Sequence, residues 1–441
     1  MQVSSENQRK TAVKLLCRVQ QGGAYSNLLL DEHFKKSKMT AQEKKFCAAL
    51  FYGTLERRYT LDKIIEKYSS RPSDKLNCEI RAILETALYQ LLYMDSVPES
   101  AAVNEAVDLA SKNRNPAVKG YVNGLLRSFL RDEKRLPSGK SKVEQLSLQY
   151  SCPADLTEKW LSELGEKNTV SLLADSLGSP PITVKVNTLK VSAAELLQRL
   201  TDEGFTAKIN RYFDDCIDVK GYAPESSQCY KDGLFHVQDI SSRLCCKAVD
   251  ALEGMTVLDI CSAPGGKTFT IAELMFNKGK LFSFDLHEKR ADLVEKGAER
   301  LGINIVKASA NNGKVYNSSM PMADRVLCDV PCSGLGVIRR KPEIKYKDLS
   351  DFDGLPEIQY QILDTSSKYV KPNGYLIYST CTVSDAENRD NVLRFLKEHP
   401  DFELAPLWND MGKFDGDEML TVLPEYFNSD GFYIAKFKRI S

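Results

Sequence analysis

Two cysteines carry the side chains most capable of covalent chemistry in this 441-residue sequence. Cys332 lies in the run Asp329-Val-Pro-Cys-Ser-Gly334, and Cys381 ends the run Ser379-Thr-Cys. A lone cysteine is usually a buried packing residue, whereas a thiolate stabilised by a cation or a helix N-terminus is a strong nucleophile. Together, beside an acid, the pair indicates nucleophilic catalysis and leaves the attacking cysteine open. Positive charge to stabilise a thiolate is available from Lys267, Arg339, Arg340 and Lys341.

A glycine-rich run ahead of the cysteines suits an adenosine ligand. It reads Asp259-Ile-Cys-Ser-Ala-Pro-Gly-Gly-Lys-Thr268, where a predicted strand turns into a helix. Its glycines let backbone N–H groups approach a ligand, and a helix N-terminus favours a negative group such as a carboxylate. The run fits neither Walker A nor GxGxxG spacing, which disfavours a triphosphate or a dinucleotide. Asp285, about twenty residues further on, suits hydrogen bonds to ribose hydroxyls.

These residues follow predicted strands in the C-terminal half. Strands are predicted at 256–260, 280–285, 303–307, 325–329 and 375–379, with helices at 268–276, 288–300 and 357–370. Such alternation is typical of βαβ crossovers and predicts an α/β, Rossmann-like domain with a parallel, doubly wound sheet. Because ligands of such sheets bind at the carboxyl ends of the strands, the glycine run and both cysteines are expected at one edge.

Two further domains are predicted ahead of residue 236. Residues 1–135 show apolar positions at helical spacing and no β-rich run, which predicts an all-helical domain. Residues 131–140 are charged and then punctuated by Pro and Gly, as in a linker. Residues 145–235 are expected to form a small α/β subdomain, with strands at 182–187 and 216–220 and a helix at 193–200. Residues 236–441 form the third domain.

The zero net charge of the chain, from 60 basic and 60 acidic residues, conceals an asymmetry. Residues 1–140 carry 24 Lys and Arg against 16 Asp and Glu, a net of +8, which leaves −8 for the remainder. A basic module suggests contact with nucleic-acid phosphates, although a solvated basic face is an equally good interpretation.

Composition excludes several protein classes. With 42% hydrophobic and 27% charged residues, the chain suits ordinary globular cores rather than disorder. No apolar run approaches the ~20 residues that span a membrane, and the N-terminus does not read as a secretory leader. The four histidines and twelve cysteines lack metal-ligand spacing, so no metal is expected. We therefore expect a soluble cytoplasmic protein with reduced thiols.

The order of these motifs resembles a known family. The Asp259–Thr268 run, the Asp-Val-Pro-Cys-Ser-Gly run and the Ser-Thr-Cys run resemble the S-adenosylmethionine-dependent RNA cytosine-C5 methyltransferases. Val237-Gln-Asp239, Asp430-Gly-Phe-Tyr433 and the spacer at 336–343 also match. Residues 1–130 resemble the NusB-like RNA-binding fold through 103–108 and 121–127. The combination is similar to the bacterial 16S rRNA enzymes of the RsmB (Sun/Fmu) type.

The resemblance implies a class I methyltransferase domain, an RNA-recognition-like subdomain and specific roles. Cys381 would be the nucleophile that adds to cytosine C6, Cys332 would assist product release, and Asp329 would hold the cytosine edge. DNA cytosine methyltransferases use the Pro-Cys cysteine instead, so the two roles could be exchanged. Arg339, Arg340 and Lys341 would contact RNA near the target.

The resemblance also implies the cofactor contacts. S-adenosylmethionine would contact Cys261, Ser262, Ala263, Pro264, Gly265, Gly266, Lys267, Asp285 and Asp329. The family usually has an Asp near the adenine after the third strand, and this chain has Asn311 there, or Ala310 by another alignment.

Two other functions stay open. The same chemistry on tRNA or another RNA is one, and a non-catalytic, antitermination-like RNA-binding factor is the other. A monomer acting on 16S rRNA is the expectation.

Overall fold

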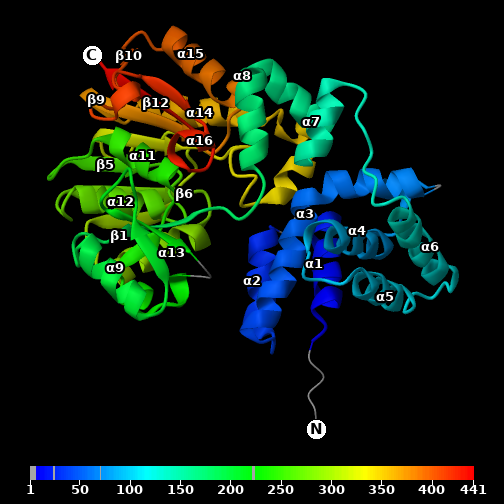
Figure 1. The fold of residues 1–441 in the computed structure, drawn as a ribbon. Coiled ribbons are helices and arrows are strands. Elements are labelled where there is room, and N and C mark those ends of the chain that lie inside the picture. Colours follow the sequence, from blue (N-terminus) through cyan, green and yellow to red (C-terminus); the bar gives the residue numbers. More distant parts are fainter. Residues whose placement is uncertain (1–5, 23–24, 70, 221–223) are drawn as a thin grey trace. The chain divides into compact units, whose positions relative to one another are not determined.

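The computed structural model describes residues 6–22, 25–69, 71–220 and 224–441 (Figure 1). They form two compact units. The first comprises Met1–Ser179 and Ile338–Leu349, and the second comprises Pro180–Val337 and Ser350–Ser441. The helices of 142–175 therefore pack with the N-terminal helices. The sequence had placed most of this segment in the small subdomain predicted at 145–235. The predicted domain boundaries stay predictions.

The first unit is helical throughout the part that the structure describes, as its apolar periodicity predicts. Its α-helices are α1 (Gln8–Gly22), α2 (Ser26–Lys36), α3 (Ala41–Tyr68), α4 (Cys78–Tyr93), α5 (Glu99–Ala110), α6 (Ala117–Arg131), α7 (Lys142–Tyr150) and α8 (Ala154–Asp175). Short 3-10 turns η1 (Ser73–Lys75) and η3 (Pro342–Tyr346) complete it. A capping box between Thr40 and Glu43 starts α3, which buries Leu50 and Leu61 in a core shared with α1 and α4.

The second unit begins with a small antiparallel sheet in the order β2-β3-β1-β4. Its elements are β1 (Ile182–Val186), α9 (Ala193–Asp202), β2 (Thr206–Ile209), β3 (Cys216–Lys220), η2 (Pro224–Ser226), α10 (Gln228–Lys231) and β4 (Phe235–Val237). The predicted strands at 182–187 and 216–220 and the predicted helix are confirmed. Strands β2 and β4 were not predicted, because β2 is half exposed and β4 has three residues, too short for a clear period.

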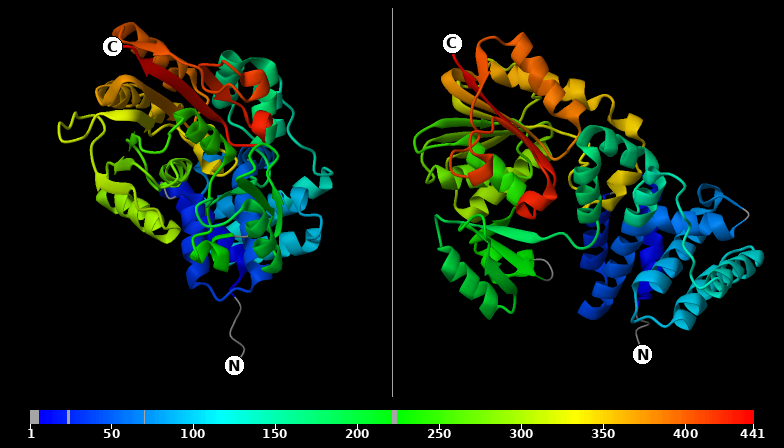
Figure 2. Two further views of the ribbon diagram at one scale, coloured as in Figure 1. Left: turned by 90° about the vertical axis from the view of Figure 1, so that its left-hand side faces the viewer. Right: turned by 45° about the horizontal axis from the view of Figure 1, so that its top comes forward.

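The larger sheet of this unit has the order β10-β12-β9-β8-β5-β6-β7, with β11 on β12 (Figure 2). Its strands are β5 (Thr256–Asp259), β6 (Lys280–Asp285), β7 (Val306–Ala310), β8 (Ala323–Asp329), β9 (Val370–Thr380), β10 (Phe402–Leu404), β11 (Met419–Val422) and β12 (Phe432–Arg439). The five predicted strands are present and parallel, with β7 starting three residues later than predicted. Three further strands, β10, β11 and β12, join the sheet antiparallel.

Helices cover both faces of this sheet, as the Rossmann-like prediction requires. They are α11 (Ile240–Val249), α12 (Gly266–Leu274), α13 (Glu288–Leu301), α14 (Leu355–Ser367), α15 (Arg389–Glu398) and α16 (Pro424–Phe427), with 3-10 turns η4 (Leu349–Phe352), η5 (Asp385–Glu387) and η6 (Gly412–Phe414). The first three pack on one face and α14 and α15 on the other, because neighbouring strand residues such as Val257 and Leu258 belong to opposite cores. The strand order reverses between β5 and β8, which makes this edge the expected ligand site.

A buried charge cluster joins the small sheet to the larger one. The Lys185 ammonium on β1 is 1% exposed and lies 2.6 Å from the Glu273 carboxylate on α12. Asp215 completes the cluster at 3.3 Å from Lys185, and Arg243 on α11 lies 2.9 Å from Asp215. Burial raises the pKa of Glu273 to about 7 in spite of the lysine. The small sheet is therefore held on the larger one by ion pairs centred on the buried Lys185 and Glu273 side chains.

Replacing Lys185 by Met should destabilise the second unit. Breaking one partner of a buried ion pair costs about 3–5 kcal/mol, since the remaining charge is left unpaired. We expect a loss near the lower end, about 3 kcal/mol, because a proton can neutralise Glu273. Urea unfolding measures this loss. Lys208→Met is the matched control, because Lys208 lies in the same sheet and is exposed. Equal stabilities for the two variants would contradict the role of the cluster.

Candidate functional site

The glycine-rich run forms a tight loop between β5 and α12, as predicted. Ser262 donates from its backbone N–H to the carbonyl oxygen of Phe284 on β6 at 2.7 Å, which ties the loop to the neighbouring strand. Gly265 precedes the first residue of α12 with φ +108°, a conformation that favours glycine. A Cβ at Gly265 would lie 2.4 Å from the ring of Phe269. The loop shape therefore depends on this glycine.

A cavity of about 190 Å³ opens beside the loop. It is lined by Val237, Gln238, Asp239, Ser242, Asp259, Cys261, Ser262, Ala263, Pro264, Gly266, Lys267 and Asp329. Seven residues predicted for the cofactor are thus brought together. Asp239 and Asp259 also line the cavity. Neither was predicted to be a site residue, although each belongs to a motif named in the sequence analysis. Asp239 also caps α11 and accepts the backbone N–H of Asp430 at 3.0 Å, so the motifs at 237–239 and 430–433 meet here.

Asp259 has the electrostatics of a ligand-binding group. It is fully buried at the end of β5, and one carboxylate oxygen accepts the Thr268 hydroxyl at 2.7 Å. The other oxygen, Oδ1, has no hydrogen-bond partner among the described residues, yet the residue lines the cavity. Burial raises the pKa of Asp259 to about 7. A cationic or N–H donor in the cavity would satisfy this oxygen.

Asp285 and Asn311 lie together at the ends of β6 and β7. The Asn311 backbone N–H donates to the Asp285 carbonyl oxygen at 2.8 Å, and Ala310 is the register partner of Asp285. One Asp285 carboxylate oxygen accepts the His287 N–H at 3.2 Å, and Arg290 lies 3.4 Å from the other. Arg290 also donates to the Ala263 carbonyl oxygen at 2.9 Å, which links Asp285 to the glycine loop.

Asp329 at the end of β8 bonds to side chains of two neighbouring elements, α12 and β9. Its Oδ2 accepts from the Lys267 ammonium at 2.8 Å, and its Oδ1 accepts from the Ser379 hydroxyl at 2.8 Å. Burial alone would lower the pKa of Lys267, but the Asp329 charge outweighs it and holds that pKa above its ordinary value. Lys267 is therefore a permanent cation at the cavity.

The two cysteines meet across the ends of β8 and β9. Their Sγ atoms lie 3.1 Å apart, and the Cys381 backbone N–H donates to the Cys332 sulfur at 3.3 Å. The hydrogen bond to Cys381, together with burial, raises the pKa of the Cys332 thiol well above its ordinary value. Gly336, which lies close to Gly431, donates its backbone N–H to the Cys381 carbonyl oxygen at 3.0 Å. This bond holds the backbone at Cys381. The structure thus assembles the predicted pair.

The predicted RNA-contacting residues lie in the segment that packs with the helical unit. Arg339, Arg340 and Lys341 are each partly buried, and the Lys341 ammonium lies 4.6 Å above the ring of Tyr25. Two bonds anchor the segment on α3, because Lys345 donates to the Glu56 carbonyl oxygen at 2.7 Å and the Tyr346 hydroxyl accepts the Tyr59 N–H at 3.2 Å. Their contact with RNA stays a prediction.

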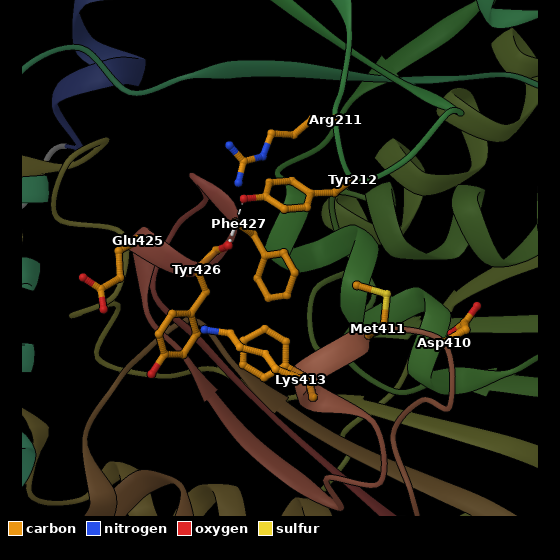
Figure 3. Close-up of a pocket in the computed structure, with 9 residues that line it drawn as sticks. Arg211, Tyr212, Asp410, Met411, Lys413, Glu425, Tyr426 and Phe427 are labelled. Atoms are coloured by element: carbon orange, nitrogen blue, oxygen red, sulfur yellow. Dashed lines mark hydrogen bonds between the residues drawn. The ribbon is translucent and has the colours of Figure 1, made fainter.

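A second hollow, of about 710 Å³, is lined by neither the two cysteines nor the glycine loop (Figure 3). Its lining combines aromatic rings with charges of both signs, namely Arg211, Tyr212, Asp410, Met411, Lys413, Phe414, Glu425, Tyr426 and Phe427. Lys413 lies 4.7 Å from the Tyr426 ring and 4.8 Å from the Phe414 ring. None of the residues predicted for chemistry lines it, so the smaller cavity is the better candidate site.

The described residues contain no group of three or more His, Cys, Asp or Glu placed to hold a metal ion. Across the same residues, no helix has the length and apolar character needed to cross a membrane.

Family models match three parts of the chain. The model of the 16S rRNA methyltransferase RsmB/F matches residues 247–438, the NusB family model matches 6–131, and an RsmF/B-like ferredoxin-like domain model matches 152–224. A relative from Bacillus subtilis, named probable ribosomal RNA small subunit methyltransferase B, is 35% identical over 98% of both chains.

Solved structures are similar as well. One, described as the crystal structure of PH0851, has a TM-score of 0.83 and 28% identity, and the match covers 100% of both chains. Another is NSun6 from Pyrococcus horikoshii with SFG, which has a TM-score of 0.59 at 20% identity and covers 66% of this chain and 98% of that chain. The second likeness concerns the fold alone.

Replacing Gly265 by Ala should destabilise the site loop. Left-handed backbone strain costs about 1–3 kcal/mol for a residue with a Cβ, and the contact with Phe269 adds to it. Gly254→Ala is the matched control, because Gly254 also has positive φ but open space around its Cβ position. Urea unfolding should show the larger loss of stability for Gly265→Ala. Equal losses would show that Phe269 leaves room for the methyl group.

Proposed function

This chain belongs to the RsmB/F family of rRNA methyltransferases, and we propose that it methylates C5 of a cytosine in 16S rRNA with S-adenosylmethionine as the donor. The family resemblance and the fold class predicted from the sequence are thereby confirmed. One observation carries the finer proposal: the sulfur atoms of Cys332 and Cys381 lie 3.1 Å apart at the strand ends beside the cavity.

The chemistry needs a nucleophile because cytosine C5 is a poor carbon nucleophile. In the proposed reaction the Cys381 thiolate adds to C6, and the C5=C6 electron pair becomes available at C5. C5 then takes the methyl group from the sulfonium sulfur, which keeps the electron pair of the broken S–C bond. A base removes the C5 proton, the electron pair of that C–H bond restores the double bond, and Cys381 leaves as thiolate. Asp329 holds the edge of the ring and stabilises its protonated form.

The hydrogen bonds of the pair favour Cys381 as the nucleophile. The Cys332 sulfur already accepts the Cys381 N–H, so its own S–H can point at the Cys381 sulfur. Its raised pKa keeps Cys332 protonated. A thiol that donates to its neighbour stabilises a thiolate there. Cys332 then stands ready to assist release.

The cavity fits the proposed methyl donor. Bound S-adenosylmethionine supplies an electrophilic sulfonium methyl group. The buried, unpaired Oδ1 of Asp259 would accept from its amino group, and the loop of Cys261–Lys267 would surround it with backbone groups. Asp285 would take the ribose hydroxyls, and Asn311, adjacent to it, the adenine.

The RNA substrate must present an unstacked cytosine, because a base stacked inside a duplex leaves the Cys381 thiol no approach to C6. The helical domain, with its net charge of +8 over residues 1–140, would contact RNA phosphates. Such contacts position the RNA but do not select its sequence. Arg339, Arg340 and Lys341 would extend these contacts. We expect a cytoplasmic monomer that acts on free or early-assembling 16S rRNA.

Methyl transfer from labelled S-adenosylmethionine to protein-free 16S rRNA, read by nucleoside mass spectrometry, tests the proposal. The expected product is 5-methylcytidine. If 5-methylcytidine forms on tRNA but not on rRNA, the substrate is a different RNA from the one proposed. Failure on both, with no binding of S-adenosylmethionine by calorimetry, would favour a non-catalytic RNA-binding protein.

Replacing Cys381 by Ala should abolish methyl transfer, since it removes the thiolate that adds to C6 in the proposed reaction and Cys332 stays protonated. S-adenosylmethionine should bind as tightly as before, because Cys381 is not among the residues lining the cavity. Cys328→Ala, a buried cysteine on β8 that bonds Ser366, is the matched control and should keep activity. Retained turnover in Cys381→Ala would transfer the nucleophile role to Cys332.

Replacing Cys332 by Ala should trap a covalent protein–RNA adduct. Addition by Cys381 proceeds in this variant while release is slow, so a slow-migrating band is expected on a denaturing gel. The band should disappear in the Cys332→Ala, Cys381→Ala double variant. Normal turnover without a band would remove the release role from Cys332.

A further inference from the structure

Two consecutive residues, Glu387 and Asn388, hold the backbone on both sides of the two cysteines. They lie at the end of η5, which follows the Cys381 tip, and their side chains are 3% and 0% exposed. Neither residue was singled out from the sequence, because an acid and an amide in a short turn usually only cap it.

Glu387 acts on the Cys332 side. Its Oε2 accepts the backbone N–H of Ser333 at 2.9 Å and the side-chain amide of Gln359 at 2.8 Å. The same Gln359 nitrogen donates to the Pro331 carbonyl oxygen at 2.9 Å. The peptide groups on either side of Cys332 are thus held by one carboxylate and one amide, both buried.

Asn388 acts on the Cys381 side. Its Oδ1 accepts the Thr380 hydroxyl at 2.6 Å, and its Nδ2 donates to the Thr382 carbonyl oxygen at 3.1 Å. Residues 380 and 382 flank Cys381 as 331 and 333 flank Cys332. A bond of 2.8 Å from the Ser333 hydroxyl to the Thr382 hydroxyl joins the two tips.

We propose that Glu387 and Asn388 form a positioning clamp that sets the distance between the two thiols, with Glu387 serving Cys332 and Asn388 serving Cys381. The inference rests on the proposed function and deepens it, because it explains how each thiol keeps its own role. Buried, fully bonded polar networks of this kind define one geometry, and partial loss of the bonds is costly. The Glu387 backbone carbonyl oxygen also accepts the Tyr378 hydroxyl at 2.5 Å, which fixes η5 against β9.

The clamp predicts opposite outcomes for neighbouring substitutions. Glu387→Leu removes the oxygen that accepts from both Gln359 and Ser333, so the backbone around Cys332 loosens while Cys381 stays held. Release should slow, the covalent adduct should accumulate, and turnover should fall about tenfold, since about 1 Å of misplacement can cost roughly 100-fold.

Asn388→Ala should instead lower the adduct. It removes both bonds beside Cys381, so addition slows, and the Cys332→Ala, Asn388→Ala double variant should form several-fold less adduct than Cys332→Ala alone. Glu357→Gln is the matched control, an exposed carboxylate on the same helix as Gln359 that pairs with Arg394, and it should behave as the wild type. Turnover and adduct that fall together in both variants, with both variants folded, would overturn the proposal.

A second readout is independent of methyl transfer. Iodoacetamide alkylation of the protein alone, followed by peptide mass spectrometry, should be several-fold faster at Cys332 in Glu387→Leu and at Cys381 in Asn388→Ala. If Glu387→Leu does not fold, Gln359→Leu, which removes the donor to Pro331, should show the same change at Cys332. Rates equal to those of Glu357→Gln would overturn the clamp. A wild type that forms no 5-methylcytidine, with no adduct from Cys332→Ala, would instead overturn the proposed function.

Discussion

The carboxylate of Asp329 is the interaction on which the site depends. One oxygen holds the Lys267 ammonium of the glycine loop, and the other holds the Ser379 hydroxyl beside the Cys381 tip. This sharing is possible because β5, β8 and β9 run parallel and in register, with Asp329 opposite Ser379. Without the Asp329 carboxylate, Lys267 would be an unpaired charge beside the cavity. An unpaired charge that is largely buried destabilises the folded protein.

The same register explains why the cavity and the two cysteines are neighbours. The cavity lies where the strand order reverses, and Asp329 lines it while bonding to the residue two positions before Cys381. One edge of the sheet could therefore serve both the proposed methyl donor and the proposed nucleophile. Glu387, the last residue of η5, bonds to Ser333 next to Cys332, and Asn388 directly after it bonds to Thr380 next to Cys381. These bonds restrict the positions of the two thiols more than the loops alone would.

Chain connectivity links the helical unit to the catalytic tip. The chain leaves the second unit at Val337, directly after Gly336 has bonded to Cys381, and returns at Ser350. Between these points it packs on α3 through Lys345, whose pKa burial lowers to about 8. The loop that carries Cys332 is thus covalently continuous with a segment of the proposed RNA-binding unit.

The sequence by itself determined the helical first unit, the five parallel strands and the predicted pair of cysteines. Periods of 3.6 residues and strand–helix alternation are local signals, and glycine or cysteine runs at strand ends are visible without coordinates. The roles of Cys381, Cys332 and Asn311 came from the family resemblance and stay proposals.

Only the tertiary structure decided the rest. The antiparallel strands β10–β12, the burial of Asp259, the placing of 338–349 with the helical unit and the bond from Ser333 to Glu387 all depend on residues distant in the chain. Glu387 reaches Ser333 across 54 residues, and Asp239 reaches Asp430 across 191. No local pattern encodes such contacts, because hydrogen bonds between loops form only after the sheet has brought the loops together.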